Sequence, residues 1–284
     1  MGVLNVTPDS FSDGGRFLNA EAAIARGRAL VEEGADIVDV GGESTRPGAE
    51  PVSIDDELAR VRPVLEGLAE VGVTGSAQIS IDTCKALVAR AALDAGATLV
   101  NDVSALRADP DMAAVVADGG VDCCLMHMLG EPRTMQRDPR YEDVVDDVKA
   151  FLEERLAFAV REGIAEQRVL LDPGIGFGKT LEHNLALLRR LDELAGIGRP
   201  IVIGTSRKSF LGAIAARFAG ASEPPDAQDR LAGTITTNVL ALERGARVFR
   251  VHDVAPVANA LAVAAATLGG RWTARRTGTR TQTI

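Results

Sequence analysis

Eight short apolar runs, each followed by an amphipathic stretch, recur along this chain. They are rich in Val, Ile and Leu, and they are GVLNV (2–6), DIVDV (36–40), QISID (78–82), TLVND (98–102), DCCLM (122–126), RVLLD (168–172), PIVIG (200–204) and RVFRV (247–251). Such runs are typical of strands that are buried on both faces. Eight strand–helix units predict an α/β fold, a parallel eight-stranded (β/α)8 TIM barrel. A doubly wound open sheet is the structural alternative.

The segments between the strands carry helical periodicity. They span residues 20–33, 54–70, 84–95, 111–118, 141–162, 181–194, 207–217 with 226–244, and 256–268. Glycines such as Gly34, Gly96 and Gly245 follow several of these segments, as expected at helix C-termini. We expect one barrel domain over residues 1–268. Residues 269–284 hold four arginines and no acid, the composition of a disordered tail or, alternatively, of a basic contact site.

Composition excludes several classes of protein. The net charge of −9 argues against a nucleic-acid binder. The sequence has no run of 18 apolar residues and no visible secretory signal, so we expect no membrane span and a cytoplasmic setting. The three cysteines form no CxxC pair, and a disulfide framework is not expected. Cys123 and Cys124 are adjacent within a predicted strand and are expected to pack in the core.

Polar residues or glycines follow every predicted strand. In a barrel, catalytic side chains lie where strands run into the following loops. Asp82, Asn101 and Asp172 stand at the ends of strands otherwise made of Ile, Leu and Val. An isolated buried charge is costly, so each needs a ligand or partner, or else it anchors loop backbone.

The last two strand ends are basic. Ser206, Arg207 and Lys208 follow the seventh strand, and Arg250 and His252 follow the eighth. Barrels often bind phosphate at these two loops, and a helix beginning near Ser206 would add backbone N–H groups. A solvated basic face is the alternative. The carboxylates and amide opposite suit a flat heterocycle with N–H donors, so we expect an anion on one side of the mouth and a heterocycle on the other.

The stretch DPGIGFGKT after the sixth strand resembles a nucleotide-binding loop but is not one. Pro173 replaces the first glycine of a P-loop, and Lys179 replaces the third glycine of GxGxxG. The glycines are expected to let the loop pass close to a ligand, with Phe177 as an apolar wall. His127 is either a packed residue or a mouth residue, and His183 is expected on an exposed helix face.

Taken together, these motifs resemble the dihydropteroate synthase family. They are NVTPDSFSDGG, GGESTRPGA, IDT, ND, MHM, LDPGIGFGK, SRKSFLG and RVHDV, and the resemblance spans residues 1–268. It implies a transferase of folate biosynthesis, built on a pterin-binding TIM barrel. The implied reaction joins 6-hydroxymethyl-7,8-dihydropterin diphosphate to 4-aminobenzoate, giving 7,8-dihydropteroate and diphosphate. Members typically use Mg²⁺, are commonly homodimers and are sulfonamide targets.

The resemblance also implies a role for each matching residue. Asn5 would contact the metal. Asp82, Asn101, Asp172 and Lys208 would form the pterin pocket, and Asp82, Asp172 and Lys208 are the candidates for catalysis. Thr45, Arg46 and Pro47 belong to a loop that closes over the substrates, with Thr45 on the diphosphate side together with Arg250 and His252. The aminobenzoate side would hold Arg46, Pro47, Phe177 and Ser206.

The chain departs from the family at its start, because members usually carry residues before MGVLNV, often a hairpin. Their absence would expose the barrel floor and leave the mouth intact. Two rival functions remain open. One is a pterin-binding barrel of the methyltetrahydrofolate:corrinoid methyltransferase type, against which the SRKS, RVHDV and STRPG segments count. The other is a homologue that binds pterin without turnover. A dimer face over residues 226–268 is also expected.

Overall fold

The computed structural model describes residues 1–7, 16–44, 48–131 and 133–269. Eight parallel strands follow one another in chain order around the sheet. They are β1 (Gly2–Asn5), β2 (Ile37–Gly41), β3 (Gln78–Asp82), β4 (Leu99–Asp102), β5 (Asp122–Met126), β6 (Val169–Asp172), β7 (Ile201–Ile203) and β8 (Ala246–Phe249). A parallel bridge between Gly2 and Val251 joins the two edges, so the sheet curls into a barrel. The predicted TIM-barrel architecture is confirmed.

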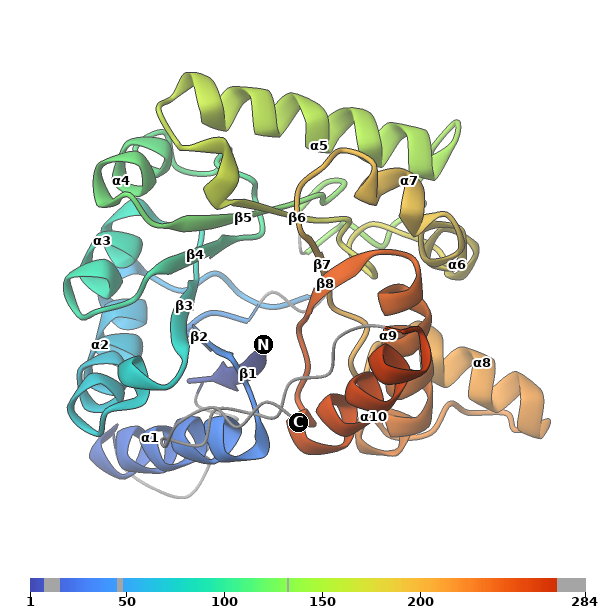
Figure 1. The fold of residues 1–284 in the computed structure, drawn as a ribbon, viewed down its shortest axis with the longest axis horizontal. Coiled ribbons are helices and arrows are strands. Elements are labelled where there is room, and N and C mark those ends of the chain that lie inside the picture. Colours follow the sequence, from blue (N-terminus) through green and yellow to red (C-terminus); the bar gives the residue numbers. More distant parts are fainter. Residues whose placement is uncertain (8–15, 45–47, 132, 270–284) are drawn as a thin grey trace.

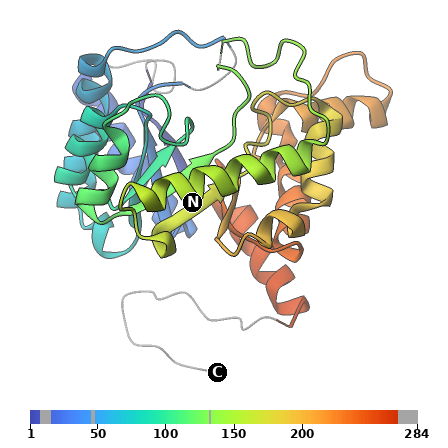
Figure 2. The same cartoon turned by 90° about the horizontal axis from the view of Figure 1, so that it is seen from above.

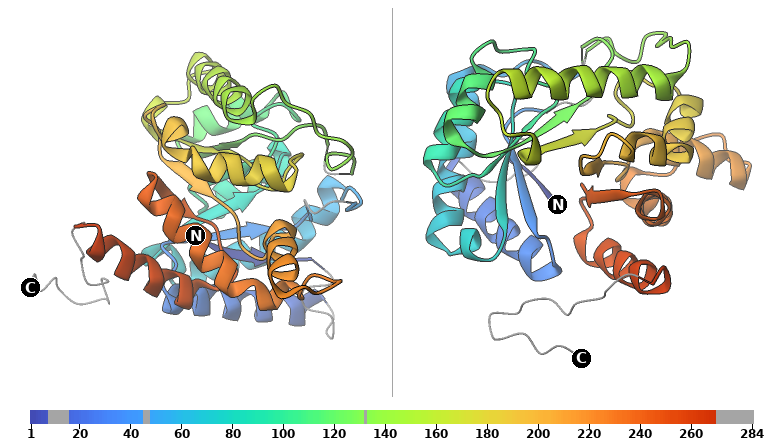
Figure 3. Two further views of the ribbon diagram at one scale, coloured as in Figure 1. Left: turned by 90° about the vertical axis from the view of Figure 1, so that its right-hand side faces the viewer. Right: turned by 45° about the horizontal axis from the view of Figure 1, so that its top comes forward.

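The helices cover the outside of this sheet. They are α1 (Arg16–Glu33), α2 (Ile54–Glu70), α3 (Ala86–Asp94), α4 (Met112–Gly119), α5 (Val144–Arg161), α6 (Leu181–Arg189), α7 (Leu191–Ala195), α8 (Ser209–Ala219), α9 (Leu231–Glu243) and α10 (Val254–Thr267). Figure 1 shows α1 to α4 along one side and α6 to α10 along the other, with α5 above. Figure 3 gives two further views of the same arrangement. Short 3₁₀ turns lie at Val73–Gly75, Glu166–Arg168 and Ala227–Arg230.

The predicted elements are all present, with shifted ends. The third and fifth strands and the second helix have their predicted bounds. The predicted helix at 207–217 begins later, at Ser209, because Arg207 adopts a left-handed conformation with φ of 61°. The predicted segment 181–194 is two helices that meet at Arg190. Of the predicted tail, residues 270–284 lie outside the described residues.

Alternation along the strands gives the barrel two different faces. The outer face packs against the helices and contributes Leu4, Val40, Ile81 and Cys123 to the main core. The inner face contributes Leu99, Cys124 and Val202 to a separate small cluster in the barrel interior. Adjacent Cys123 and Cys124 therefore pack on opposite sides of one strand, and both are buried free thiols, as expected from the sequence.

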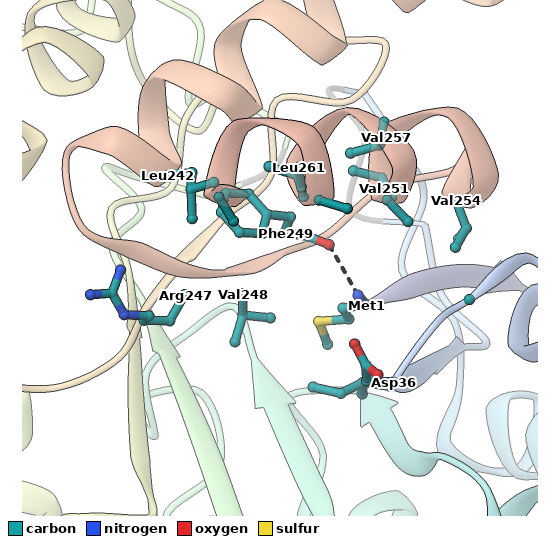
Figure 4. A pocket seen from close by; sticks show the side chains of 15 residues that line it. Met1, Asp36, Leu242, Arg247, Val248, Phe249, Val251, Val254, Val257 and Leu261 are labelled. Carbon is teal, nitrogen blue, oxygen red and sulfur yellow. Dashed lines mark hydrogen bonds between the residues drawn. The ribbon is translucent and has the colours of Figure 1, made fainter. Parts of the chain in front are cut away.

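The lower end of the barrel is closed partly by polar contacts. Gln78 Nε2 donates to Asp122 Oδ2 at 2.9 Å, and Arg168 lies 3.2 Å from the other oxygen of the same carboxylate. A hollow of about 420 Å³ lies beside this floor, between β8, α10 and the chain start. Figure 4 shows its apolar lining and the bond from the Met1 ammonium to the Phe249 carbonyl, 3.1 Å long.

The connections that follow the strands gather at the other end. Figure 2 shows the segments before α2 and before α5, together with α8, along one edge of the molecule, and the end of α10 at the opposite edge. Among the described residues, no helix is long and apolar enough to cross a membrane.

Between consecutive strands, the pairing is thinnest at β6 and β7, where Leu171 and Ile201 form the one register pair. Leu171 is fully buried in the main core. We expect Leu171→Ala to lower the free energy of unfolding by about 2–5 kcal/mol, because it leaves a cavity in the core. Few hydrogen bonds between β6 and β7 are present there to offset the lost packing. Denaturant unfolding followed by circular dichroism measures this. Leu87→Ala, at a side chain that is 61% exposed, is the control and should change the same quantity by less than about 0.5 kcal/mol. Equal losses in the two variants would contradict the packing described here.

Candidate active site

Polar inward-facing residues at the carboxyl ends of several strands gather at one mouth. Asp82 ends β3, Asn101 lies in β4 and Asp172 ends β6, and all three side chains are buried. Arg250 follows β8 and reaches the same space. Asn5 ends β1 and is half-buried. The structure thus brings these predicted site residues together.

Arg250 connects two carboxylates inside the barrel. Its Nε donates to Asp39 Oδ2 at 2.6 Å, and its Nη2 donates to Asp82 Oδ2 at 2.6 Å. Asn101 Nδ2 also donates to Asp39 Oδ2, at 3.2 Å. Asp39 is fully buried on β2 and was not among the predicted site residues. The signal was present in DIVDV, where the second Asp occupies an inward position in an apolar strand.

One guanidinium between two buried carboxylates leaves an excess of negative charge. Burial raises the pKa of Asp82 to about 7, although Arg250 opposes the shift. Burial alone would lower the pKa of Arg250, but Asp39 and Asp82 outweigh it and raise that pKa above its ordinary value. Arg250 therefore stays charged, while Asp82 can hold a proton near neutral pH.

Asp172 and Lys208 form a second charged pair across the mouth. Asp172 Oδ1 accepts the Gly174 N–H at 2.7 Å, so this carboxylate also anchors loop backbone, as the structural alternative predicted. Burial raises the pKa of Asp172, and Lys208 opposes the shift. Burial lowers the pKa of Lys208 to about 8, and here Asp172 opposes the shift. The Lys208 ammonium donates to the Ile175 carbonyl and lies 4.6 Å from the centre of the Phe177 ring.

The two basic strand ends meet through Ser206 and His252. Ser206 Oγ accepts the His252 N–H at 3.2 Å and lies 3.0 Å from His252 Nδ1. Ser206 and His252 are therefore in direct contact where the last two strands end. Arg207 turns away to pair with Asp253, with Nε 3.0 Å from Oδ2. Its left-handed backbone separates Ser206 from Lys208 and lets α8 begin immediately after the lysine.

The glycine-rich loop between β6 and α6 passes very close to the loop after β5. A Cβ on Gly174 would lie 1.9 Å from the His127 carbonyl oxygen, and one on Gly178 would lie 2.6 Å from the Leu129 carbonyl oxygen. Both glycines also have positive φ, where larger residues are strained. The structure therefore gives these two glycines a role in loop-to-loop packing.

The two histidines singled out from the sequence are both structural. His127 is buried, and its ring packs edge-on against Phe151 at 4.8 Å between centroids. The packed alternative for His127 is therefore the correct one. His183 was expected on an exposed face, and this was wrong. It is half-buried, and it caps α6, where its Nδ1 accepts the Thr180 N–H at 3.2 Å and Thr180 Oγ1 accepts the His183 N–H.

Thr45, Arg46 and Pro47 lie outside the described residues. The segments that flank them are firmly connected. Glu43 Oε1 accepts the Val52 N–H at 2.9 Å, which ties together the two ends of the connection. Lys85 Nζ lies 2.7 Å from Glu43 Oε2 and 2.5 Å from the buried Glu57. Sequence reasoning did not predict this cluster.

The described residues contain no group of three or more His, Cys, Asp or Glu side chains that could hold a metal ion. Asn5 presents a carboxamide at the end of β1, and its side chain makes no hydrogen bond to the described part of the chain. A carboxamide oxygen is a ligand that Mg²⁺ accepts, usually together with waters and substrate phosphates. The protein side of the mouth therefore fits a metal that is shared with an anionic substrate.

The raised pKa of Asp82 predicts a pH effect on stability. Its pKa is about 7 in the folded chain, above the ordinary value of 3.8, so its contribution is fully present below pH 4 and is lost as the pH rises through 7. We expect Asp82→Asn to remove this contribution. The difference in unfolding free energy between wild type and variant should change by at most about 1.4 kcal/mol per pH unit between pH 4 and 7. A difference that is constant with pH would refute the shift.

Three comparisons with known proteins bear on this geometry. The family model described as Pterin binding enzyme matches residues 1–252. Dihydropteroate synthase of Mycobacterium leprae is 49% identical over 270 residues, which cover 94% of this chain and 93% of the relative. Among solved structures, Xanthomonas albilineans dihydropteroate synthase with 4-aminobenzoic acid has a TM-score of 0.86 at 45% identity, covering 95% of this chain and 93% of the other.

A second solved structure, Yersinia pestis dihydropteroate synthase with a sulfonamide drug complex, also has a TM-score of 0.86. It is 41% identical and covers 95% of this chain and 94% of the other. These matches extend over nearly the whole barrel, including every strand end that contributes to the mouth. With its eight parallel strands and the buried acid, amide and basic groups at their ends, the chain belongs to the pterin-binding enzymes and, among them, to the dihydropteroate synthases.

Proposed function

We propose that this chain condenses 6-hydroxymethyl-7,8-dihydropterin diphosphate with 4-aminobenzoate, releasing 7,8-dihydropteroate and diphosphate. The observation that carries the proposal is the two-sided mouth. Asp82, Asn101 and Asp172 are buried on one side, and Ser206, Arg250 and His252 lie where the last two strands end. Family membership supports the same reaction.

The pterin ring would bind to the acid and amide side. Carboxylates accept hydrogen bonds from the ring N–H groups, and the Asn101 carboxamide can donate and accept. Asp82 and Asp172 are buried, so their hydrogen bonds to the ring are shielded from water. Lys208 lies beside the Phe177 ring, is affected by the charge of Asp172, and would donate to a ring acceptor. These four residues form the proposed pterin pocket.

The diphosphate would bind to the basic side. Arg250 uses Nε and Nη2 for the two carboxylates, so its Nη1 would be available to the ligand. His252 is held by Ser206, and Thr45 would join them from outside the described residues. Charge that develops on the leaving diphosphate would be stabilised by these groups. When bound, Mg²⁺ would supply further neutralisation of the diphosphate, with Asn5 as its protein ligand.

The proposed chemistry separates bond breaking from bond making. The C–O bond to the diphosphate breaks first and leaves a delocalised pterin cation, which the Asp82 and Asp172 carboxylates stabilise. The amine of 4-aminobenzoate then attacks this carbon, and the proton that its nitrogen releases passes to water or to the departing diphosphate. The amine is weakly basic and uses its neutral lone pair, so no residue is assigned as a general base. Phe177, with Ser206, Arg46 and Pro47, would form the aminobenzoate side, where a sulfonamide would compete.

We further propose a homodimer in the cytoplasm, with no nucleic-acid or membrane partner. Support for the dimer comes from large apolar side chains that are exposed on α8, α9 and α10. Phe218 is 94% exposed, Val263 is 69% exposed and Leu240 is 42% exposed. Where such groups gather on one face, they mark an interaction surface. The three free cysteines support a reducing compartment.

The direct test of the reaction is turnover with Mg²⁺ and both substrates, following diphosphate and dihydropteroate together. We expect equal release of the two products. Lys208→Ala and Asp172→Ala should each lower kcat/KM about a thousandfold or more, because each removes a charged group from the pocket. Lys149→Ala, a lysine on α5 away from the mouth, is the matched control and should retain wild-type turnover.

The same assay separates the two rival functions. Pterin binding without release of diphosphate would identify a non-catalytic homologue. Methyl transfer from methyltetrahydrofolate, with no turnover of the diphosphate, would identify the corrinoid-dependent type. Wild-type activity in Lys208→Ala would overturn the proposed pocket.

The dimer is tested at its most exposed apolar residue. We expect the wild type to have twice the chain mass by light scattering, and Phe218→Glu to shift it toward the monomer by placing a charge in the interface. Exposed Leu87 on α3 lies apart from these helices, so Leu87→Glu should leave the mass unchanged. A wild-type monomer at micromolar concentration would contradict the proposal.

A further inference from the structure

A buried lysine bridges the two loops that follow β5 and β6. Lys179 is 3% exposed, and its Nζ lies 2.9 Å from His127 Nδ1. The same nitrogen donates to the Phe177 carbonyl at 3.0 Å and to the His127 carbonyl at 3.5 Å. No role in the proposed reaction has been given to this residue. Burying a lysine is costly, so its partners must compensate.

The charges around the bridge favour a neutral imidazole, which can accept a hydrogen bond from the Lys179 amino group. Burial, together with the nearby charges of Lys179 and Arg107, lowers the pKa of His127 to about 3. Burial also lowers the pKa of Lys179, to about 7, while Asp172 opposes that shift. His127 therefore remains neutral and can accept through Nδ1, and its ring is fixed by Phe151 and Tyr141.

The bridge lies directly behind substrate-facing groups. Lys179 holds the carbonyl of Phe177, whose ring lies beside Lys208. Two further side chains donate hydrogen bonds to this loop. The Tyr141 hydroxyl donates to the Gly178 carbonyl at 2.8 Å, and Gln136 donates to the Gly176 carbonyl. The close approach of Gly174 and Gly178 to the β5 loop leaves little space for another arrangement.

We propose that Lys179 is a positioning residue: by bonding His127 and the Phe177 carbonyl, it fixes the 173–179 loop so that Phe177 forms the wall of the aminobenzoate site. This inference rests on the proposed function for the identity of the substrate. Lys179 touches no substrate in this account and acts through Phe177. A substitution that removes its amine should therefore weaken aminobenzoate binding more than it slows the chemistry.

The test is a double-mutant cycle of Lys179→Met and Phe177→Ala, with KM for 4-aminobenzoate, kcat and the thermal midpoint measured for all four proteins. We expect each single variant to raise KM about tenfold, with kcat within about threefold of wild type. The double variant should match Phe177→Ala alone, because Lys179 acts through that side chain. Effects on KM that multiply, or a KM unchanged in Lys179→Met, would overturn the inference.

Arg155→Met is the matched control for loss of a buried cation. Arg155 is 7% exposed, and its Nε donates to the Ala105 carbonyl of a different loop at 2.9 Å. We expect it to lower the thermal midpoint and to leave KM for aminobenzoate within about twofold. If KM for aminobenzoate rose equally in Arg155→Met, the rise in Lys179→Met would be explained by a general loss of stability. That result would overturn the inference.

Hydrogen–deuterium exchange separates this inference from the proposed function. In Lys179→Met the amides of residues 174–179 should exchange at least tenfold faster than in wild type. They include Gly176, whose N–H donates to Asn184 Oδ1 at 2.7 Å. This readout needs no turnover. An inactive wild type would contradict the proposed reaction, and the exchange of the loop amides would still test the role of Lys179. Unchanged exchange would overturn the role of Lys179. If Lys179→Met does not fold, the same measurement is made on His127→Phe. This variant keeps an aromatic ring at the position and removes the nitrogen that accepts from Lys179. Failure of both to fold would also overturn a positioning role.

Discussion

The mouth of this barrel depends on how one guanidinium is shared. Arg250 lies between Asp39 and Asp82, and each of the two bonds is 2.6 Å long. Without the arginine, two carboxylates would be buried in a nearly closed interior at a high cost in free energy. With it, their charges are partly neutralised, and burial still raises the pKa of Asp82 to about 7. Asn101 adds a bond to Asp39. The acid side of the site is therefore a connected network that links β2, β3, β4 and the end of β8.

The barrel explains why this network can exist. Parallel strands place their carboxyl ends at one edge, and the outward-facing residues alone form the large core against the helices. Stability is thus supplied mainly by Leu, Val and Ile on the outer face, and the upper part of the inner face is left for chemistry. The lower interior is closed by a small apolar cluster and by the bonds between Gln78, Asp122 and Arg168. The basic groups at the last two strands face the acid network across the mouth.

Much of this could be predicted from the sequence, since repeating apolar runs and strand-end motifs are local signals. QISID and DCCLM have the predicted bounds because turn residues delimit them closely. The start of α8 could not be predicted, because it depends on the left-handed backbone of Arg207, which is held by Thr234, Arg230 and Asp253 from distant segments. Asp39 and Lys179 were missed as site residues for a similar reason. Their partners Arg250 and His127 are far away in sequence, and only the closed barrel brings them together. The exposure of His183 was predicted wrongly because the periodicity of a helix does not reveal which side chain caps its first turn.

The most direct test of the account is a crystal structure of this chain with dihydropterin diphosphate bound. The account predicts the pterin ring against Asp82, Asn101 and Asp172, with Lys208 on a ring acceptor and the diphosphate beside Arg250 and His252. In that structure Arg250 should keep its bond to Asp39 while its free nitrogen turns to the diphosphate. A ring bound away from the three acid and amide groups, or a diphosphate that does not contact Arg250, would contradict the two-sided mouth.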